Sequence, residues 1–223
     1  MGKPRATARH RVTSAAVKPR LRGVSHQYAF FVALAAGAAL VVLARGGEAR
    51  AAVAVYALSL CAMFGASALY HRIDWPPRPR AWLRRLDHSM IFVLVAGTYT
   101  PFAVLVLAPA LGWTLLGIVW GGAVAGIVLS LLWVDAPRWL SAVVYVALGW
   151  VAVVGLPQLW DRAGAMAVAL LATGGVLYTV GAVVYARRRP DPAPRVFGYH
   201  EVFHVLVIAA AAVHFAAIAV FAV

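Results

Sequence analysis

Long apolar segments recur along almost the whole chain, separated by short polar stretches. A bilayer core about 30 Å thick is crossed by about 20 apolar residues in helical conformation, so each segment predicts a transmembrane α-helix. We expect seven such segments, at residues 28–44, 50–71, 85–107, 111–133, 138–156, 163–186 and 198–222.

This pattern predicts an all-α integral membrane protein. Residues 28–223 would form one seven-transmembrane helix bundle, and the basic residues 1–27 a disordered cytoplasmic arm. The composition agrees, because 64% of the residues are hydrophobic, only 12% are charged, and the mean hydropathy is +0.85. These values exclude an ordinary soluble domain.

The basic residues predict the orientation of the bundle. Seven spans place the two termini on opposite sides of the membrane. If the N-terminus is cytoplasmic, all of the 20 basic residues except Arg45, Arg50 and Arg162 lie in cytoplasmic segments. Cytoplasmic loops carry an excess of Lys and Arg, so we expect a cytoplasmic N-terminus and a C-terminus outside.

The location of the basic residues also determines how the net charge of +13 is interpreted. In a soluble protein such a charge would indicate nucleic acid as the partner. Here the charge lies in loops beside the membrane, where it would contact anionic lipid headgroups, and we expect no nucleic-acid partner. The single cysteine, Cys61, cannot form an internal disulfide, and it lies inside an apolar segment as a small hydrophobic residue would.

The fourth segment contains two pairs of glycines four residues apart. Gly117 pairs with Gly121, and Gly122 pairs with Gly126. Small residues at this spacing indicate close packing against another helix. The alternative is a membrane helix that is merely rich in glycine and alanine.

Two histidines near the start of the last segment indicate a functional site. His200 and His204 are four residues apart, so on a helix they share one face, with Cβ atoms about 5–6 Å apart. At this spacing two imidazoles can bind one metal ion, for which Zn–N distances are about 2.0–2.1 Å. Imidazoles are costly inside a membrane unless they are paired, bind a metal or face water.

Other polar residues reach the same membrane level if the N-terminus is cytoplasmic. The second segment ends there with Ser67 and His71, which share a helix face. The third segment starts there with Asp87, which needs a positive partner: a metal, its water, or the nearby Arg84 or Arg85. Ser67 would either orient a ligand or the water of a metal site, or bond to its own helix backbone.

Three further residues, His88, Glu201 and His214, are weaker candidates for this site. His88 points about 100° away from Asp87 on a helix and is a weaker candidate. His214 lies roughly 15 Å beyond His204 along the helix, too far to bind the same ion, and we expect it to bond to a neighbouring helix. The pattern His-Glu-x-x-His also occurs in soluble zinc proteases, which would make Glu201 the general base. However, Glu201 is rotated off the face of the two histidines.

The sequence around these residues resembles the hemolysin III family. This family is the bacterial branch of the progestin and adiponectin receptor (PAQR) family and is related to alkaline ceramidases. The resemblance extends over all seven segments, from about residue 24 to the end. It is carried by three stretches of sequence: Ser67-Ala-Leu-Tyr-His71, Leu86-Asp87-His88-Ser89 with the following Ala96-Gly97-Thr98-Tyr99-Thr100-Pro101, and His200-Glu-Val-Phe-His204.

The resemblance implies a multi-pass protein of the bacterial inner (plasma) membrane with a zinc ion, Zn²⁺, near the cytoplasmic face. By analogy, His71, His200 and His204 would bind the ion. The catalytic residues would be Asp87, which holds the metal-bound water, and Ser67, which lies beside it. Signalling of the receptor type is not implied.

The implied activity is hydrolysis of a lipid amide or ester, with a ceramide-like or acyl lipid entering laterally from the membrane. Three histidines leave one zinc position for water, as in catalytic sites. The alternative is a protein without turnover, in which zinc holds helices together. Such a protein would be a regulator of membrane homeostasis or a pore-forming, haemolysin-like cytolysin. A pore predicts a continuous polar stripe along several helices, which the sequence lacks.

Overall fold

In the computed structural model, which describes residues 18–133 and 135–222, glycine and proline mark where the helices begin. Glycine precedes α1 (Val24–Leu43) and α2 (Gly47–Arg72). Proline opens α3 (Pro77–Leu105) and α4 (Pro109–Leu132), where the missing N–H costs no intrahelical hydrogen bond.

The second half of the chain contains three further helices and a short 3₁₀ segment. Helix α5 (Arg138–Trp150) continues through η1 (Val151–Gly155) into α6 (Leu156–Arg187), and α7 (Tyr199–Ala222) follows a loop. The described residues contain helices and no strands. The boundaries differ from the expected ones most at the start of α3, which begins eight residues before residue 85. Helix α6 begins at residue 156, but its long regular part follows the irregular backbone at Gly164, close to the expected start at residue 163.

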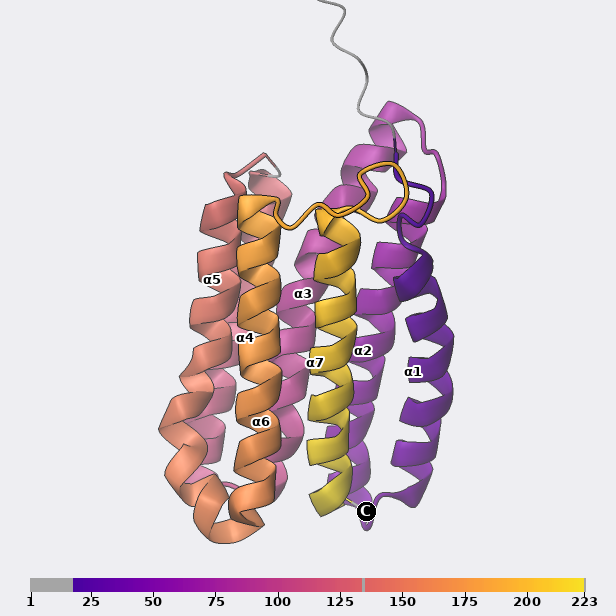
Figure 1. The fold of residues 1–223 in the computed structure, drawn as a ribbon. Helices are drawn as coiled ribbons and strands as arrows, with labels where there is room; N and C mark the ends of the chain where they lie inside the picture. Colours follow the sequence, from indigo (N-terminus) through magenta and orange to yellow (C-terminus); the bar gives the residue numbers. More distant parts are fainter. Residues whose placement is uncertain (1–17, 134, 223) are drawn as a thin grey trace, which may run out of the picture.

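Six helical runs in the described part of the chain are long and apolar enough to cross a membrane. Five are α1, α2, α3, α4 and α7. The other is the 50-residue run Arg138–Arg187, which consists of α5, η1 and α6. Its backbone leaves the helical conformation at Gly164, and Figure 1 shows the chain reversing direction within the run, so that α5 and α6 form separate rods.

The helices alternate in direction, and polar contacts join the loops at each end. We call the end where α1, α3, α5 and α7 begin the upper end, at the top of Figure 1. There, Arg84 pairs with Asp135 at 2.7 Å, and the backbone N–H of Leu21 donates to the carbonyl of Val196. At the lower end, the backbone N–H of Arg45 donates to the carbonyl of Ala222.

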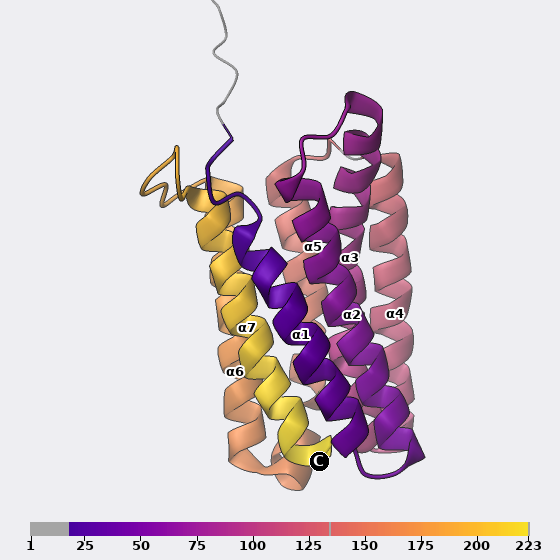
Figure 2. The ribbon, with the colours of Figure 1, turned by 90° about the vertical axis from the view of Figure 1, so that its right-hand side faces the viewer.

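Helix α7 occupies a position that touches four other helices. It packs against α6 and also contacts α1, α2 and α3. Figure 2 shows α1 lying between α7 and α2. The main core is formed by buried apolar residues of these helices, including Tyr56 and Ile218. The start of α7 is therefore brought next to the end of α2 and the start of α1.

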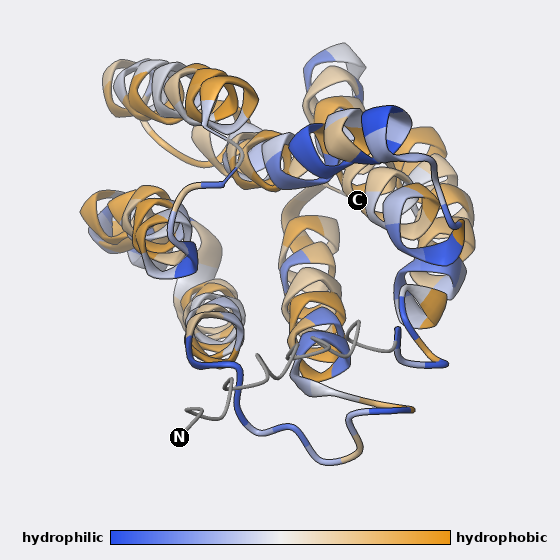
Figure 3. Cartoon of the chain, turned by 90° about the horizontal axis from the view of Figure 1, so that it is seen from above, coloured by the Kyte–Doolittle hydropathy of each residue, from blue (hydrophilic) through white to orange (hydrophobic). Residues whose placement is uncertain are grey.

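The outer surface of the helices is apolar, as membrane contact requires. Large apolar side chains point outward, among them Val42, Leu58, Trp113 and Leu132. Figure 3 looks down the bundle and shows hydrophilic residues concentrated at the helix ends and in the loops. The hydrophobic surface and the six long apolar helices together describe a multi-pass membrane protein.

The two glycine pairs of α4 differ in their surroundings. A Cβ atom at Gly122 would lie 2.6 Å from the side chain of Leu148 on α5, and one at Gly126 would clash with the ring of Phe92 on α3. At Gly117 and Gly121 a Cβ atom would meet nothing within 4 Å. Close helix packing therefore explains only the pair formed by Gly122 and Gly126.

The expected N-terminal arm is only partly described. Its residues 1–17 lie outside the described residues. Residues 18–23 run across the upper end of the bundle, and α1 begins at Val24, four residues before the expected start. This shift places His26 inside α1 and not in the expected arm of residues 1–27.

Candidate metal centre

Three histidines from two helices meet at the upper end of the bundle. His71 lies in the last turn of α2, and His200 and His204 lie in the first turns of α7. One ring nitrogen of each lies within 4.8 Å of the other two. The Nε2 atoms of His71 and His200 are 3.1 Å apart. The structure thus brings together the three residues that the sequence singled out.

Local structure explains this meeting. His200 and His204 are one helical turn apart, and their ring centroids lie 4.5 Å from each other. His71 packs against the start of the first helix, because Gly23, the residue before α1, lies directly against it. A Cβ atom at Gly23 would lie 2.6 Å from the Cβ of His71, and the backbone there has a φ of +76°, which favours glycine.

The donor set fits a zinc ion. Two imidazole nitrogens only 3.1 Å apart must share a proton or direct their lone pairs at a common cation. The Nδ1 atom of His204 is buried and has no hydrogen-bond partner among the described residues. Three neutral imidazoles are a donor set that Zn²⁺ prefers.

Asp87 lies beside this group on the next helix. In α3, its Oδ2 atom is 3.7 Å from Nε2 of His71 and 3.9 Å from Nδ1 of His88, and its side chain is only 15% exposed. The two arginines that the sequence offered as partners are engaged elsewhere, because Arg84 pairs with Asp135 and Arg85 donates to backbone carbonyls. The carboxylate therefore faces the histidines.

Ser67 and His26 form a buried pair next to the same histidines. Ser67 lies one turn before His71 on α2 and is 2% exposed. Its Oγ atom is 2.8 Å from Nδ1 of His26, so of the two alternatives left open by the sequence, the bond to its own helix backbone is not the contact that is formed. The ring of His26 is also stacked on that of His204, with centroids 3.7 Å apart and planes inclined by 7°.

His26 is the residue of this site that sequence reasoning missed. A signal for it was available in the orientation argument. A cytoplasmic N-terminus places the first turn of the first helix at the same level as His71, Asp87 and His200. Because the first segment was expected to start at residue 28, His26 was not included among the polar residues expected at this level.

Glu201 does not face the three histidines. Its Oε1 atom lies 2.8 Å from Nε of Arg22, and its Oε2 atom accepts a hydrogen bond from the backbone N–H of Gly198. The residue is 1% exposed. Because both oxygens are engaged by Arg22 and Gly198, the arrangement of a protease with Glu201 as general base is not formed.

Two other histidines of the described residues, His88 and His214, lie outside the group of three, as expected. His88 lies outside the group of three, with Nδ1 at 2.7 Å from the carbonyl of Arg84 and Nε2 at 3.5 Å from the hydroxyl of Tyr185. His214 contacts a neighbouring helix, with Nε2 at 3.2 Å from the carbonyl of Leu171 on α6.

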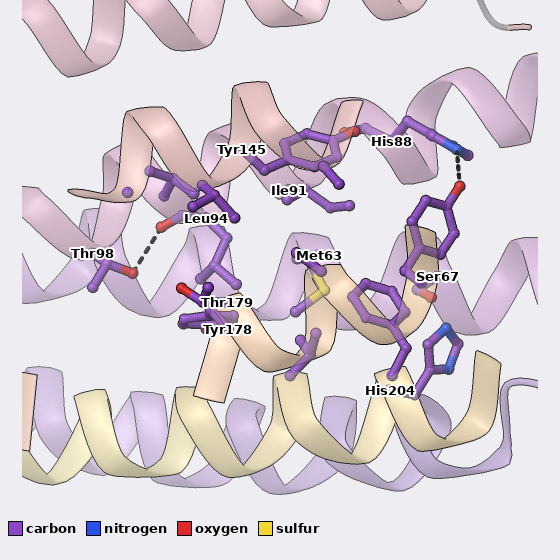
Figure 4. Close-up of a pocket in the computed structure, with 18 of the residues that line it drawn as sticks. Met63, Ser67, His88, Ile91, Leu94, Thr98, Tyr145, Tyr178, Thr179 and His204 are labelled. Carbon is purple, nitrogen blue, oxygen red and sulfur yellow. Dashed lines mark hydrogen bonds between the residues drawn. The ribbon is translucent and has the colours of Figure 1, made fainter. Parts of the chain in front are cut away.

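A large cavity opens from the three histidines into the bundle. Its volume is about 880 Å³. At the upper end it is lined by His71, Asp87 and His200, and it reaches Leu107 and Leu159 toward the lower end. Most residues that line it are apolar, and Figure 4 shows Met63, Ile91 and Leu94 around it, with His204 at one end.

The segment before α1 lines the upper end of the cavity through Lys18, Pro19 and Arg22. Lys18 donates hydrogen bonds to Oδ1 of Asp74, at 2.8 Å, and to the carbonyl of Arg72. The ammonium group of Lys18 lowers the pKa of the Asp74 carboxyl group. The backbone N–H of Arg20 donates to the carbonyl of Arg195. These bonds link the end of α2 to the loop before α7.

The chain is similar to known bacterial and mammalian membrane proteins. The family model described as "Haemolysin-III related" matches residues 14–215. "Hemolysin-3" of Bacillus cereus is 34% identical over 183 residues, which cover 79% of this chain and 80% of that protein. "Hemolysin-3 homolog" of Bacillus subtilis (strain 168) is 34% identical over 161 residues, 72% of each.

A mammalian protein matches more weakly. "Monocyte to macrophage differentiation factor" of Homo sapiens is 25% identical over 171 residues, covering 74% of this chain and 67% of that protein. The extent of the family match and the identity to the bacterial relatives agree with the helical bundle described above. The chain belongs to the haemolysin-III-related family, as a multi-pass protein of the bacterial plasma membrane.

Proposed function

We propose that this protein is an intramembrane hydrolase of lipid amides or esters that depends on a zinc ion near the cytoplasmic face. The observation that carries the proposal is the position of His71, His200 and His204 at the mouth of an apolar cavity of about 880 Å³. The three histidines would hold Zn²⁺ and leave one position open, as in catalytic zinc sites. Such an ion polarises a carbonyl group and acidifies water.

The residues around the ion would move the protons. Asp87, with Oδ2 3.7 Å from Nε2 of His71, would accept a proton from the attacking water, and this short distance supports the role. The oxygen of that water forms the new bond to the carbonyl carbon. The C–N or C–O bond of the substrate then breaks, and Asp87 returns the proton to the departing amine or alcohol. Ser67 lies beside this path with its hydroxyl held by His26.

The cavity would hold the acyl chain. Its apolar lining suits a hydrocarbon, and its upper end brings the head of the lipid to the three histidines. A ceramide-like or other acyl lipid is the substrate class that this shape favours. Basic residues of the upper end, such as Arg80 and Arg187, would contact anionic headgroups of the surrounding membrane.

The test is release of fatty acid by the purified protein. Protein with stoichiometric zinc should release fatty acid from ceramides or related acyl lipids, detected by mass spectrometry. The variants His71→Ala and Asp87→Asn should lose the activity, whereas Arg187→Gln, at the same end but outside the cavity, should retain it. Zinc-loaded protein that releases no fatty acid from any lipid amide or ester would overturn the proposal.

The names of the two bacterial relatives, Hemolysin-3 and Hemolysin-3 homolog, support a second candidate, a haemolysin-like cytolytic protein with structural zinc. In that case zinc would hold α2 and α7 together without turnover, and the protein would act on the membrane as a pore or a regulator of its state. Leakage of liposomes that survives the His71→Ala substitution would favour this candidate. The apolar lining of the cavity favours hydrolysis.

We also propose that the chain crosses the membrane seven times, with the N-terminus inside and the C-terminus outside. The reversal of the chain between α5 and α6 supports two crossings by the run Arg138–Arg187. The positions of Arg45, Arg50 and Arg162, the only basic residues expected outside, support the direction. Cysteines placed at Gly46 and Arg188 in a Cys61→Ser background should label from outside and inside, respectively. The opposite labelling would overturn the orientation.

A further inference from the structure

His26 is a buried titratable side chain that lies against the candidate metal ligands and has no role in the proton transfers proposed above. It lies in the first turn of α1 and is 2% exposed. Three groups hold it: the hydroxyl of Ser67 at 2.8 Å, the edge of the Phe64 ring with a centroid distance of 5.1 Å, and the face of His204 at 3.7 Å. Its orientation is therefore fixed.

Its geometry separates it from the three candidate ligands. The rings of His71, His200 and His204 are inclined to one another by 59–68°. In contrast, His26 is nearly parallel to His204 and lies over its face. The lone pair of an imidazole nitrogen lies in the plane of its ring. A cation bound in the plane of His204 is therefore not on the lone-pair axis of the stacked His26.

Burying His26 in this way has a cost. Its Nε2 atom is buried and has no hydrogen-bond partner among the described residues. An unpaired buried polar atom destabilises the folded protein, because it has lost its hydrogen bonds to water. A leucine or phenylalanine would fill the same volume without this cost, so simple packing does not explain an imidazole here. An apolar residue at position 26 could not form the hydrogen bond to Ser67, and this bond explains why a histidine is present.

We propose that His26 is a positioning residue of the metal centre. Its ring fixes the plane of His204 by stacking, and its Nδ1 atom fixes the direction of the Ser67 hydroxyl. The inference rests on the metal site proposed above but not on hydrolysis. It makes α1 the fourth helix of the site, in addition to α2, α3 and α7.

The two contacts can be separated by substitution. His26→Phe retains a ring that stacks on His204 but loses the bond to Ser67. His26→Asn places an amide near the position of Nδ1 and retains the bond, but it loses the stacking. His26→Ala loses both contacts. Ser67→Ala removes the hydrogen bond from the opposite side. His214→Ala is the matched control, because it removes a buried histidine of α7 that lies away from the site.

The readouts are zinc affinity, measured by competition with a chelator in detergent, and the visible absorption spectrum of the Co²⁺-loaded protein. Groups that orient metal ligands typically contribute about 10–100-fold to metal affinity. We expect His26→Ala to lower zinc affinity by at least about tenfold and to change the Co²⁺ spectrum. His26→Phe should keep the affinity closer to wild type, with a Co²⁺ spectrum like that of Ser67→Ala. His214→Ala should leave both readouts unchanged.

Each outcome decides the proposal. Wild-type affinity and an unchanged Co²⁺ spectrum in His26→Ala would overturn it while leaving the metal site intact. Failure of the wild-type protein to bind metal would overturn the metal site itself and this inference with it. If His26→Ala does not fold, as judged by gel filtration and thermal unfolding, then His26→Phe and His26→Asn decide. Two folded variants with wild-type affinity and spectrum would contradict the proposal.

Discussion

At the scale of single residues, the site depends on nitrogen atoms held close together in an apolar environment. The Nε2 atoms of His71 and His200 are 3.1 Å apart, and His204 is almost fully buried beside them. Each imidazole contributes one possible ligand, and two ligands alone hold zinc poorly in competition with water. Loss of any one of the three should therefore be sufficient to empty the site.

We predict that His71→Ala and His200→Ala each abolish stoichiometric zinc in the purified protein. Elemental analysis of detergent-purified protein measures this directly. His88→Ala serves as the control, since His88 lines the same cavity but is not one of the three grouped histidines. Equal zinc content in His71→Ala and wild type would contradict the assignment of ligands.

The buried pair of Arg22 and Glu201 gives a second prediction at this scale. Their atoms lie 2.8 Å apart, with side-chain exposures of 19% and 2%. Removal of one partner from a buried pair leaves an uncompensated charge and typically costs about 3–5 kcal/mol. We expect Arg22→Met to lower the free energy of unfolding by about 3 kcal/mol, measured by denaturant unfolding in detergent. The double variant with Glu201→Leu should recover much of this loss.

An exposed pair at the same end provides the comparison. Arg84 and Asp135 also approach to 2.7 Å, but their side chains are 36% and 78% exposed. Because exposed pairs typically contribute less than about 1 kcal/mol, Asp135→Asn should have little effect. A similar loss in both single variants would show that burial of Glu201 does not determine its contribution.

The residues of the site were predictable to different degrees. The four-residue spacing of His200 and His204 is a local signal. Both residues lie in the expected helix, α7, which places them on the same face. The approach of His71 and Asp87 followed from the direction of their helices. The stacking of His26 on His204 could not be predicted, because it depends on the lateral packing of α1 against α7, which no local pattern encodes.

At the scale of elements, the helices were predictable because twenty apolar residues in a row have few alternatives in a membrane. Their ends were less predictable. Helix α3 begins at Pro77, well before the apolar segment, because proline starts a helix readily and the polar first turns remain outside the apolar core. The 3₁₀ segment η1 and the irregular backbone at Gly164 are set by the reversal of the chain between α5 and α6.

Helix α4 offers a prediction about packing. A methyl group at position 126 would clash with Phe92, whereas one at position 121 would meet nothing within 4 Å. We expect Gly126→Ala to lower the free energy of unfolding by about 1–3 kcal/mol, since overpacking displaces the neighbouring ring. Gly121→Ala should be neutral or stabilising by less than about 1 kcal/mol, because alanine favours a helix. Thermal unfolding in detergent compares the two, and equal effects would contradict close packing at Gly126.

At the scale of the whole molecule, the cavity extends from the site into the lower half of the bundle. It begins beside the three histidines and continues between α3, α5, α6 and α7 toward Leu107 and Leu159. No single helix contains it. Sequence patterns indicate which residues avoid water, but a cavity arises from how seven helices fail to fill the space between them. For this reason the residues of the site could be predicted from the sequence, but the extent of the cavity could not.

The depth of the cavity sets a limit on the acyl chain that it can hold. Tyr185 lies at the level of the site, with its ring centroid 6.0 Å from that of His200. Gly175 lies on the same helix ten residues earlier, about 15 Å further down, and also lines the cavity. Gly175→Leu should therefore obstruct chains that extend beyond about 15 Å and leave shorter chains unaffected. Hydrolysis rates measured over a series of acyl-chain lengths test this expectation. The control is Gly117→Leu. Gly117 lies outside the cavity lining, and a Cβ atom there would also meet nothing within 4 Å. The same chain-length profile in both variants would show that acyl chains do not occupy the lower part of the cavity.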